Sequence, residues 1–245
     1  MAPCLAGRVR LSPRPAGRAD TSDRLTRTVH LTPGTPIRVD ATIADLTIAG
    51  SNRTDVLVDI VRHAPSAADL AKYPALVDQR PDALHISAVQ ANDGRDAKLK
   101  ADITIRAPAE AVFQAIRVFE GRVGLTNLKG VCDVDLRRGA IDAAGLAGRV
   151  RLEAGIGSLD LKQPELTPGG MMRLRVFNGP LRVRFARPPA NARILAVTLN
   201  GTITSDIPLT MRDKFGPRFG ETTIGSGAPV MSVDVVKGDI IIKVG

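Results

Sequence analysis

Apolar and polar residues alternate in short segments over most of this chain, which is the pattern of half-buried β-strands. Several of the segments are also rich in Val, Ile and Thr, the β-branched residues that favour extended backbone. We therefore predict a protein built almost wholly from strands. The clearest early segments are residues 36–40, 43–48, 55–61, 83–89 and 101–106.

Two stretches depart from this pattern. Residues 64–83 contain Pro65, Pro74 and Pro81, and we expect a loop insert there with one helical turn. Residues 110–119 have helical propensity taken alone. We predict a strand for them because the repeat that follows begins in register.

A glycine repeat is the strongest feature of the sequence. Five glycines occur at a spacing of nine, and each opens the same short pattern, which recurs three more times with longer spacers. The second and fourth residues after each glycine are apolar in fifteen of sixteen cases, Ser205 being the exception. The glycines are Gly121, Gly130, Gly139, Gly148 and Gly157, followed by Gly179, Gly201 and Gly238. The second positions are Val123, Cys132, Ile141, Val150, Leu159, Leu181, Ile203 and Ile240, and the fourth are Leu125, Val134, Ala143, Leu152, Leu161, Val183, Ser205 and Ile242.

The repeat has a direct physical interpretation. Alternate residues of a strand face the same side, so the second and fourth positions point inward. Glycine permits a tight corner between strands, and strands this short must stack on their neighbours to be stable. Two units per turn give about 18 residues, stacked about 4.8 Å apart. We predict an all-β, single-stranded β-solenoid (β-helix) of short glycine-punctuated strands. The alternative is a β-sandwich, which we disfavour because hairpin signals are scarce.

Composition and charge divide the chain in two. Residues 1–27 are rich in Arg, Pro, Gly and Ser, and we predict a flexible basic tail there, followed by the solenoid domain over 28–245. The net charge is +9, and aromatic residues make up only 3%. Positive charge gathers in residues 1–30 and again in residues 171–193, which hold six Arg and no acid. Nucleic acid, acidic polysaccharide and a membrane surface are the partners that this charge suits; a solvated face is the simpler explanation.

The cysteines and the N-terminal segment give no sign of a disulfide, a transmembrane helix or a signal peptide. Cys132 falls on an inward position and Cys4 lies in the predicted tail, so we expect no disulfide between them. No apolar run approaches the roughly 18 residues that a transmembrane helix needs. The N-terminus as given has no apolar core of the kind that signal peptides carry.

The repeat resembles the bacterial putative-adhesin family, a domain of unknown function built from repeated Gly-Asp-Ile-type strand units. The stretches that carry the resemblance occur in family order over roughly residues 28–245. It implies a right-handed single-stranded β-helix in the cell envelope or another extracytoplasmic setting, and no established activity. The chain departs from the family by showing no signal peptide. The matching stretches are residues 43–50, 55–58, the nine-residue array, 178–181, 200–209, 224–230 and 237–242.

No catalytic, cofactor or metal site is recognisable in the sequence. Residues 18 apart stack in the predicted solenoid, which sets Asp142 beside Asp160 and Asp133 beside Arg151. Two stacked carboxylates raise one another's pKa, a property useful to a general acid. The simpler interpretation is that all four are outward polar residues. Histidines 30, 63 and 85 have no metal-ligand spacing.

Four arginines are the best candidates for binding. These residues are Arg173, Arg175, Arg182 and Arg184, and each alternates with apolar neighbours along the chain. We therefore expect the four side chains to share one outward face as a column. Such a column suits repeating anionic groups. Without interleaved aromatic residues, base stacking has no platform, which makes nucleic acid a poor candidate. Protection of a sheet edge is the competing explanation.

These observations favour a non-enzymatic domain for cell-envelope adhesion, scaffolding or partner binding, with anionic polysaccharide or an envelope protein as the partner. One alternative is a polysaccharide-active enzyme that uses the stacked carboxylates. Another is a self-associating envelope-stress regulatory module, which requires that the last strand, residues 240–244, be free to pair end to end.

Overall fold

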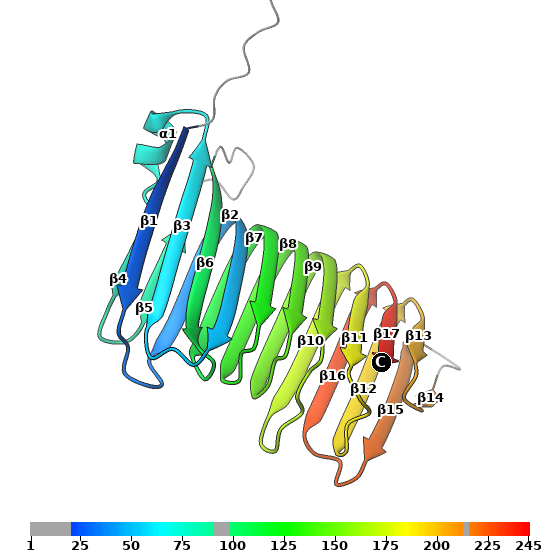
Figure 1. Cartoon of the computed structure of the whole chain (residues 1–245). Coiled ribbons are helices and arrows are strands. Elements are labelled where there is room, and N and C mark those ends of the chain that lie inside the picture. The colour runs from blue at the N-terminus through cyan, green and yellow to red at the C-terminus, as the bar shows by residue number, and fades with distance from the viewer. Residues whose placement is uncertain (1–20, 91–98, 213–215) are drawn as a thin grey trace, which may run out of the picture.

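Strands account for most of the chain, and they hydrogen-bond into one mixed sheet of seventeen strands over the described residues. The computed structural model describes residues 21–90, 99–212 and 216–245. The prediction of an all-β protein is confirmed. Figure 1 shows the strands side by side in one long row. In chain order the elements are β1 Thr21–Val29, β2 Pro36–Ser51, β3 Val56–Ala64, α1 Ala67–Lys72, β4 Leu76–Gln79, β5 Leu84–Ala88, β6 Lys100–Pro108, β7 Val112–Thr126, β8 Val131–Ala144, β9 Arg149–Lys162, β10 Met171–Asn178, β11 Leu181–Phe185, β12 Ala192–Asn200, β13 Ile203–Ser205, β14 Thr210–Arg212, β15 Arg218–Ile224, β16 Val230–Lys237 and β17 Ile240–Val244.

The centre of the sheet repeats every 18 residues. Strands β7, β8 and β9 pair in parallel, and the register sets Val123 beside Ile141 and Ile141 beside Leu159. Two nine-residue units therefore make up one repeat, as the glycine spacing predicts.

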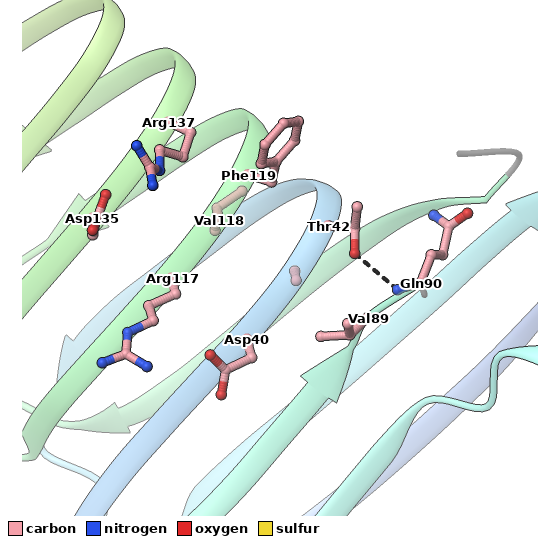
Figure 2. Close-up of a pocket in the computed structure, with 10 residues that line it drawn as sticks. Asp40, Thr42, Val89, Gln90, Arg117, Val118, Phe119, Asp135 and Arg137 are labelled. Atoms are coloured by element: carbon pink, nitrogen blue, oxygen red, sulfur yellow. Dashed lines mark hydrogen bonds between the residues drawn. The ribbon is translucent and has the colours of Figure 1, made fainter. Parts of the chain in front are cut away.

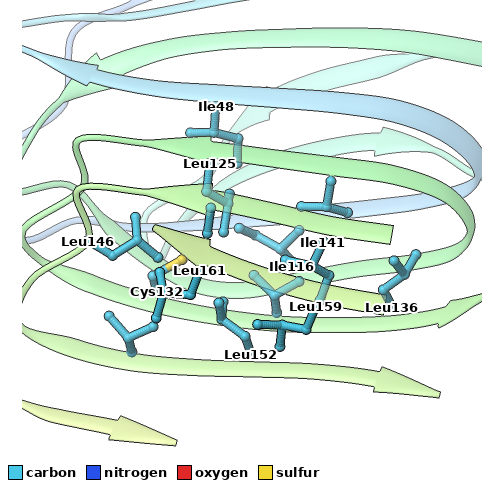
Figure 3. Packing of buried hydrophobic residues seen from close by; sticks show 14 of the residues in the cluster. Ile48, Ile116, Leu125, Cys132, Leu136, Ile141, Leu146, Leu152, Leu159 and Leu161 are labelled. Atoms are coloured by element: carbon cyan, nitrogen blue, oxygen red, sulfur yellow. The ribbon is translucent and has the colours of Figure 1, made fainter. Parts of the chain in front are cut away.

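Each long central strand bends once. In β8, Cys132, Val134 and Leu136 are buried before the bend, and Ile141 and Ala143 are buried after it. The buried positions change from even to odd numbers across Gly139, because the strand turns a corner there and its two halves then face a shared interior. Figure 3 shows side chains from both halves meeting between the strands.

The bends fold the sheet into two layers, which we call layer A and layer B. Layer A holds the first halves of the bent strands, and layer B holds the second halves. By pairing, layer A runs β4, β5, first half of β2, first halves of β7, β8 and β9, then β10, β16, β12, β15 and β14. Layer B runs β1, β3, β6, second half of β2, second halves of β7, β8 and β9, then β11, β17 and β13.

The interior between the layers is aliphatic. Fourteen of the sixteen positions predicted to face inward are buried, and only Ile203 and Ser205, near the C-terminal end of layer B, are half-buried. Burial raises the pKa of the Cys132 thiol to about 12, so this sulfur is protonated at neutral pH and contributes only packing. Cys4 lies outside the described residues.

Two columns of glycine line the corners. A Cβ built at Gly139, where φ is +133°, would lie 1.7 Å from the carbonyl oxygen of Gly121. Gly157 meets Gly139 in the same way, and Gly179 meets Gly157. Gly148 instead approaches Gly130 at the opposite corner. The five equally spaced glycines thus alternate between two corners, and at both the backbones are too close for any side chain.

The expectation of a chain that turns one way throughout is wrong at both ends. Antiparallel pairs join β1 to β3, β3 to β6 and β4 to β5 near the N-terminus, and join β12 to β15 and β14 to β15 near the C-terminus. The terminal strands of a stack have no further repeat to pair with. Folding the chain back over them satisfies backbone groups that would otherwise be exposed.

The predicted tail extends too far into the chain. Strand β1 covers Thr21–Val29, so residues 21–27 belong to the sheet. Arg62, which is buried, donates to Asp23 and to the carbonyl oxygen of Leu70, and Arg24 donates to both carboxylate oxygens of Asp59 at 2.7 and 2.6 Å. These ion pairs hold β1, whose outward residues are too polar to indicate a strand from sequence. Residues 1–20 lie outside the described residues, so the division into tail and domain stays a prediction.

The loop insert contains more regular structure than predicted. Its helical turn is α1, in which the Ser66 hydroxyl accepts from the Asp69 amide at 3.2 Å. Four residues later β4 adds an antiparallel strand to β5. The prolines mark the limits of these elements, which is why the segment as a whole resembles a loop in sequence.

The last strand is enclosed on both sides. Strand β17 pairs with β11 on one side and with β13 on the other, although β13 precedes it in sequence. Lys243 donates to Asp206 at 2.9 Å, and this hydrogen bond lowers the pKa of the Asp206 carboxyl. The free strand edge that end-to-end association through residues 240–244 requires is therefore missing from β17.

Replacing Gly139 by Ala tests the glycine column. We expect Gly139→Ala to lower the free energy of unfolding by more than about 3 kcal/mol, because the new methyl group overlaps a backbone oxygen and φ is positive. Gly124→Ala is the matched control, since its Cβ would meet nothing nearer than 3.8 Å. The control should change stability by less than about 1 kcal/mol. If urea denaturation gave the same loss of unfolding free energy for Gly139→Ala and Gly124→Ala, the role of the glycine column would be contradicted.

Truncating Leu152 tests the interior. This residue is fully buried, so Leu152→Ala should cost about 2–5 kcal/mol of unfolding free energy. Ile156, four residues along the same strand, is 55% exposed. Ile156→Ala should change stability by no more than about 0.5 kcal/mol in the same denaturation experiment. A small loss for Leu152→Ala would show that the two layers do not enclose a packed core.

Candidate functional site

The four candidate arginines do not form one column. All four side chains are exposed, but Arg173 and Arg175 lie on β10 in layer A, and Arg182 and Arg184 lie on β11 in layer B. The chain turns a corner at residues 178–180, between the two strands. The alternation in sequence correctly predicts that the side chains face outward, but it cannot reveal a corner that sends the two pairs to opposite layers.

The neighbours of these arginines differ between the layers. Arg182 lies 3.7 Å from Asp160, and the Arg175 guanidinium lies 5.6 Å from the ring centre of Phe177. Arg184 is paired in register with Lys162 and Lys243, which gives layer B a short basic row. Contact of these arginines with an anionic polymer stays a prediction.

The stacked carboxylates occur as predicted, but outside any described cavity. Asp142 and Asp160 are register partners in layer B, and Asp133 accepts from Arg151 at 2.9 Å. Neither Asp142 nor Asp160 lines any of the three cavities described below. Their position on the outer face of layer B, beside Arg182, fits outward polar residues better than a cleft for hydrolysis.

A different set of residues surrounds a cavity of about 310 Å³ on the outside of layer A. Asp40, Arg117 and Asp135 are successive register partners on β2, β7 and β8. Phe119 and Arg137 lie two residues further along their strands, next to the corner. Figure 2 shows these side chains around the hollow. We call this site the corner groove.

Strand alternation and the 18-residue repeat position the corner groove. Val118 and Leu136 are buried partners, so the residues on either side of them in β7 and β8 face solvent. Arg117 and Asp135 therefore project from one side of this buried pair, and Phe119 and Arg137 from the other. The strands are hydrogen-bonded on both sides, which holds the four side chains on a rigid base.

The charged residues of the corner groove form no ion pairs with one another in the described chain. Within the described part of the chain, no ion pair within 4 Å involves Asp40, Arg117, Asp135 or Arg137. By contrast, Arg151 pairs with its register partner Asp133 and with Glu153, which is the register partner of Asp135 on β9. The groove therefore offers two carboxylates and two guanidinium groups with hydrogen-bonding capacity for a ligand.

A second cavity of about 580 Å³ continues the groove along the corner and shares Phe119, Asp135 and Arg137 with the first. Its further lining includes Gly155, Ile156 and Phe177. A Cβ at Gly155 would lie 2.5 Å from the Arg137 carbonyl oxygen, so no side chain fills this position. The missing side chain leaves the space between Arg137 and Phe177 open.

One edge of the corner groove is built from Val89 and Gln90, which follow β5. Thr42, which is buried, accepts from the backbone amide of Gln90 at 2.8 Å. The Gln90 side chain in turn donates to the Leu99 carbonyl and accepts from the Leu99 amide. These hydrogen bonds fix Val89, which is exposed, at the margin of the cavity.

A third cavity of about 500 Å³ lies near the N-terminal end, between the β1–β2 connection and the start of β7. Leu31, Pro33, Ile37 and Val56 give it a mainly apolar lining. Arg53 at its margin pairs with Asp55 at 2.8 Å. The cavity offers fewer polar groups than the corner groove and suits an apolar group.

Sequence analysis missed the corner groove, although a signal was present. Residues 117 and 135 are 18 apart, as are 119 and 137, and the 18-residue repeat could have placed each pair side by side. The outward residues considered from the sequence are those at the third position after each glycine, whereas Asp135 occupies the fifth position after Gly130. Asp40 lies upstream of the glycine array and could be assigned to this site only from tertiary pairing.

The described ranges contain neither a cluster of metal ligands nor a membrane-spanning helix. No group of three or more His, Cys, Asp or Glu side chains there is arranged to hold a metal ion. His63 approaches Asp102 at 3.2 Å and has no second such neighbour among the ion pairs of the described chain. No helix within residues 21–90, 99–212 or 216–245 is long and apolar enough to cross a bilayer.

Comparison with known proteins gives only distant structural likenesses. No protein-family model matches the chain. No curated protein matches it either. Among solved structures, a putative cell adhesion protein from Clostridium sporogenes is 10% identical, with a TM-score of 0.49, 91% of this chain covered and 100% of that chain covered.

Two further structures show the same breadth of coverage. A putative adhesin from Bacteroides fragilis is 14% identical over 91% of this chain and 97% of that chain, with a TM-score of 0.42. A putative lipid binding protein from Parabacteroides distasonis is 8% identical over 91% and 97%, with a TM-score of 0.34. All three scores are below 0.5, so we take function from the chain's own geometry, and membership of the putative-adhesin family stays a prediction.

The double variant Asp142→Asn/Asp160→Asn tests the enzyme hypothesis. Both side chains lie outside the described cavities, so we expect no loss of any polysaccharide-cleaving activity and a free energy of unfolding that is unchanged or raised by up to about 1 kcal/mol, because two like charges are removed. Release of reducing ends and chemical denaturation are the measurements. Activity present in the native protein and absent in the variant would restore the carboxylates as catalytic groups.

Proposed function

We propose that this chain is a non-enzymatic β-solenoid module of the cell envelope that serves adhesion or scaffolding, and that it binds acidic polysaccharide in the corner groove. The 18-residue parallel register and the glycine columns support the solenoid for the central repeats. Its right-handed, single-stranded form and its extracytoplasmic setting follow from the family resemblance.

The unpaired charges of the corner groove are the observation that carries this proposal. Arginine binds carboxylate or sulfate groups through two parallel hydrogen bonds, which Arg117 and Arg137 are free to make. Asp40 and Asp135 accept hydrogen bonds from sugar hydroxyls. The Phe119 ring, which is half-buried at the corner, offers an apolar surface to the face of a sugar ring. A repeating chain of acidic sugars supplies all three partners: anionic groups for the arginines, hydroxyls for the aspartates and a ring face for Phe119.

The same residues are poorly arranged for catalysis. Glycoside hydrolysis requires two carboxyl groups on either side of the bond to be cleaved. Asp40 and Asp135 instead have Arg117 in register between them, where a substrate ring would have to lie. The thiol of Cys132 is buried and protonated, so it supplies no nucleophile.

Binding to defined polymers tests the proposal. Purified chain is titrated with polygalacturonate, chondroitin sulfate and neutral dextran, and binding is measured by affinity electrophoresis and calorimetry. We expect affinity for at least one acidic polymer, and Arg117→Ala/Arg137→Ala should weaken it by about tenfold or more, because two charge-assisted hydrogen-bonding groups are lost. No polymer should be shortened.

Arg182→Ala/Arg184→Ala is the matched control, because it removes the same charge from the opposite layer. This variant should bind nearly as well as the native chain. A larger loss in the control would move the contact to the arginines predicted from sequence and overturn the corner groove as the site. Absence of binding to every acidic polymer, or cleavage of one, would overturn the proposed function.

A further inference from the structure

The C-terminal half of layer A carries most of the large apolar side chains that are exposed in the described chain. Eight such residues are exposed in the described chain, and five of them lie on β9, β10, β12 and β16. Ile156, Phe177 and Leu199 are 55%, 44% and 50% exposed. The other two, Met171 and Val230, are register partners at the far ends of β10 and β16.

Register brings the first three residues into one strip along the corner. Val176, Val235 and Thr198 are partners on β10, β16 and β12, and so are Asn178, Lys237 and Asn200. Phe177, Val236 and Leu199 lie between these two rows and therefore stand beside one another. On β9, Gly155 stands beside Phe177, and Ile156, which pairs with Asn178, is exposed one residue beyond this line. Four adjacent strands make a strip about 14 Å long, which we call the apolar strip.

Cations border the apolar strip. Arg138 is the register partner of Ile156, Arg175 lies 5.6 Å from the Phe177 ring, and Lys237 follows Val236. All three side chains are exposed. Over the described residues of 171–245, Lys and Arg number ten and Asp and Glu number four, an excess of six positive charges.

The acidic residues near the apolar strip do not neutralise its cations. Glu153 already accepts from Arg151 at 2.6 Å. Asp234, the register partner of Arg175, accepts from the Ser232 hydroxyl at 3.2 Å. No ion pair within 4 Å, over the described ranges, involves Arg138, Arg175 or Lys237. Their charges therefore remain available to an external anion.

We propose that the apolar strip docks on the surface of a membrane that contains anionic lipid. Apolar side chains at a surface of excess positive charge are the combination that such an interface binds, since the side chains enter the boundary of the acyl chains while Arg and Lys meet the headgroups. A polysaccharide does not need three exposed aliphatic and aromatic side chains grouped at one corner. The apolar strip shares Ile156 and Phe177 with the second cavity of the corner groove. The first cavity contains neither residue, and the polysaccharide proposal is tested at Arg117 and Arg137, so the two proposals can fail separately.

The charge complementarity also predicts an orientation. Because the strip runs along the corner next to layer A, docking would bring this corner to the lipid and leave the outer face of layer B accessible. The basic row of Lys162, Arg184 and Lys243 lies on layer B and would then point away from the contact. Its loss should not reduce binding to lipid.

Vesicle cosedimentation of the full chain tests the proposal. The probes are vesicles of phosphatidylcholine alone and of phosphatidylcholine mixed with phosphatidylglycerol. We expect binding to the mixed vesicles and little to the neutral ones. Phe177→Ser/Leu199→Ser should weaken binding about tenfold or more, because two side chains that enter the acyl boundary are lost. Circular dichroism checks that the variant is folded.

Two controls make the outcome decisive. Leu76 is 52% exposed on β4 at the opposite end of the sheet, and Leu76→Ser should leave vesicle binding unchanged. Arg175→Gln/Lys237→Gln should reduce binding to the anionic vesicles. Binding that is equal in native chain and Phe177→Ser/Leu199→Ser, or that high salt abolishes completely, would show adsorption by net charge alone and would overturn the proposal. Failure to bind mixed vesicles would also overturn it, and neither result would affect the corner groove.

Discussion

The close approach of backbones at the two corners is the constraint on which this structure depends. Where Gly139 lies over Gly121 and Gly157 over Gly139, the carbonyl oxygen of the previous repeat occupies the space that a β-carbon would need. This contact allows the strand to bend without leaving its hydrogen-bonding register. The bend in turn lets one sheet enclose its own aliphatic core between its two layers.

That constraint also determines how the outer surface is organised. Because register is kept across the corners, residues 18 apart in the centre form straight rows, and their side chains act together. One row places Arg117 between Asp40 and Asp135, which creates the corner groove. A neighbouring row aligns Phe177 with Val236 and Leu199. Both candidate contacts are therefore rows of register neighbours on a rigid paired sheet, formed by the repeat in the centre and by pairing between distant segments at Asp40 and Val236.

Both ends of the stack use departures from the repeat. At the N-terminal end, β1 and β3 fold back in antiparallel pairing, and the buried Arg62 links them to the insert through Asp23 and Leu70. At the C-terminal end, the last strands β16 and β17 enter between earlier ones and leave neither with a free edge. These arrangements limit uncontrolled pairing with other chains, which a long row of strands would otherwise invite.

The sequence by itself determined the central strands, their 18-residue spacing and most of the inward aliphatic positions, because glycine spacing and strand alternation are local properties of the chain. Only the tertiary structure decided which layer each outward residue occupies. A corner between Phe177 and Leu181 sends Arg175 and Arg182 to opposite layers, and pairing between distant segments brings Asp40 to Arg117. Such pairings depend on contacts over long sequence separations, which no local pattern of polar and apolar residues encodes.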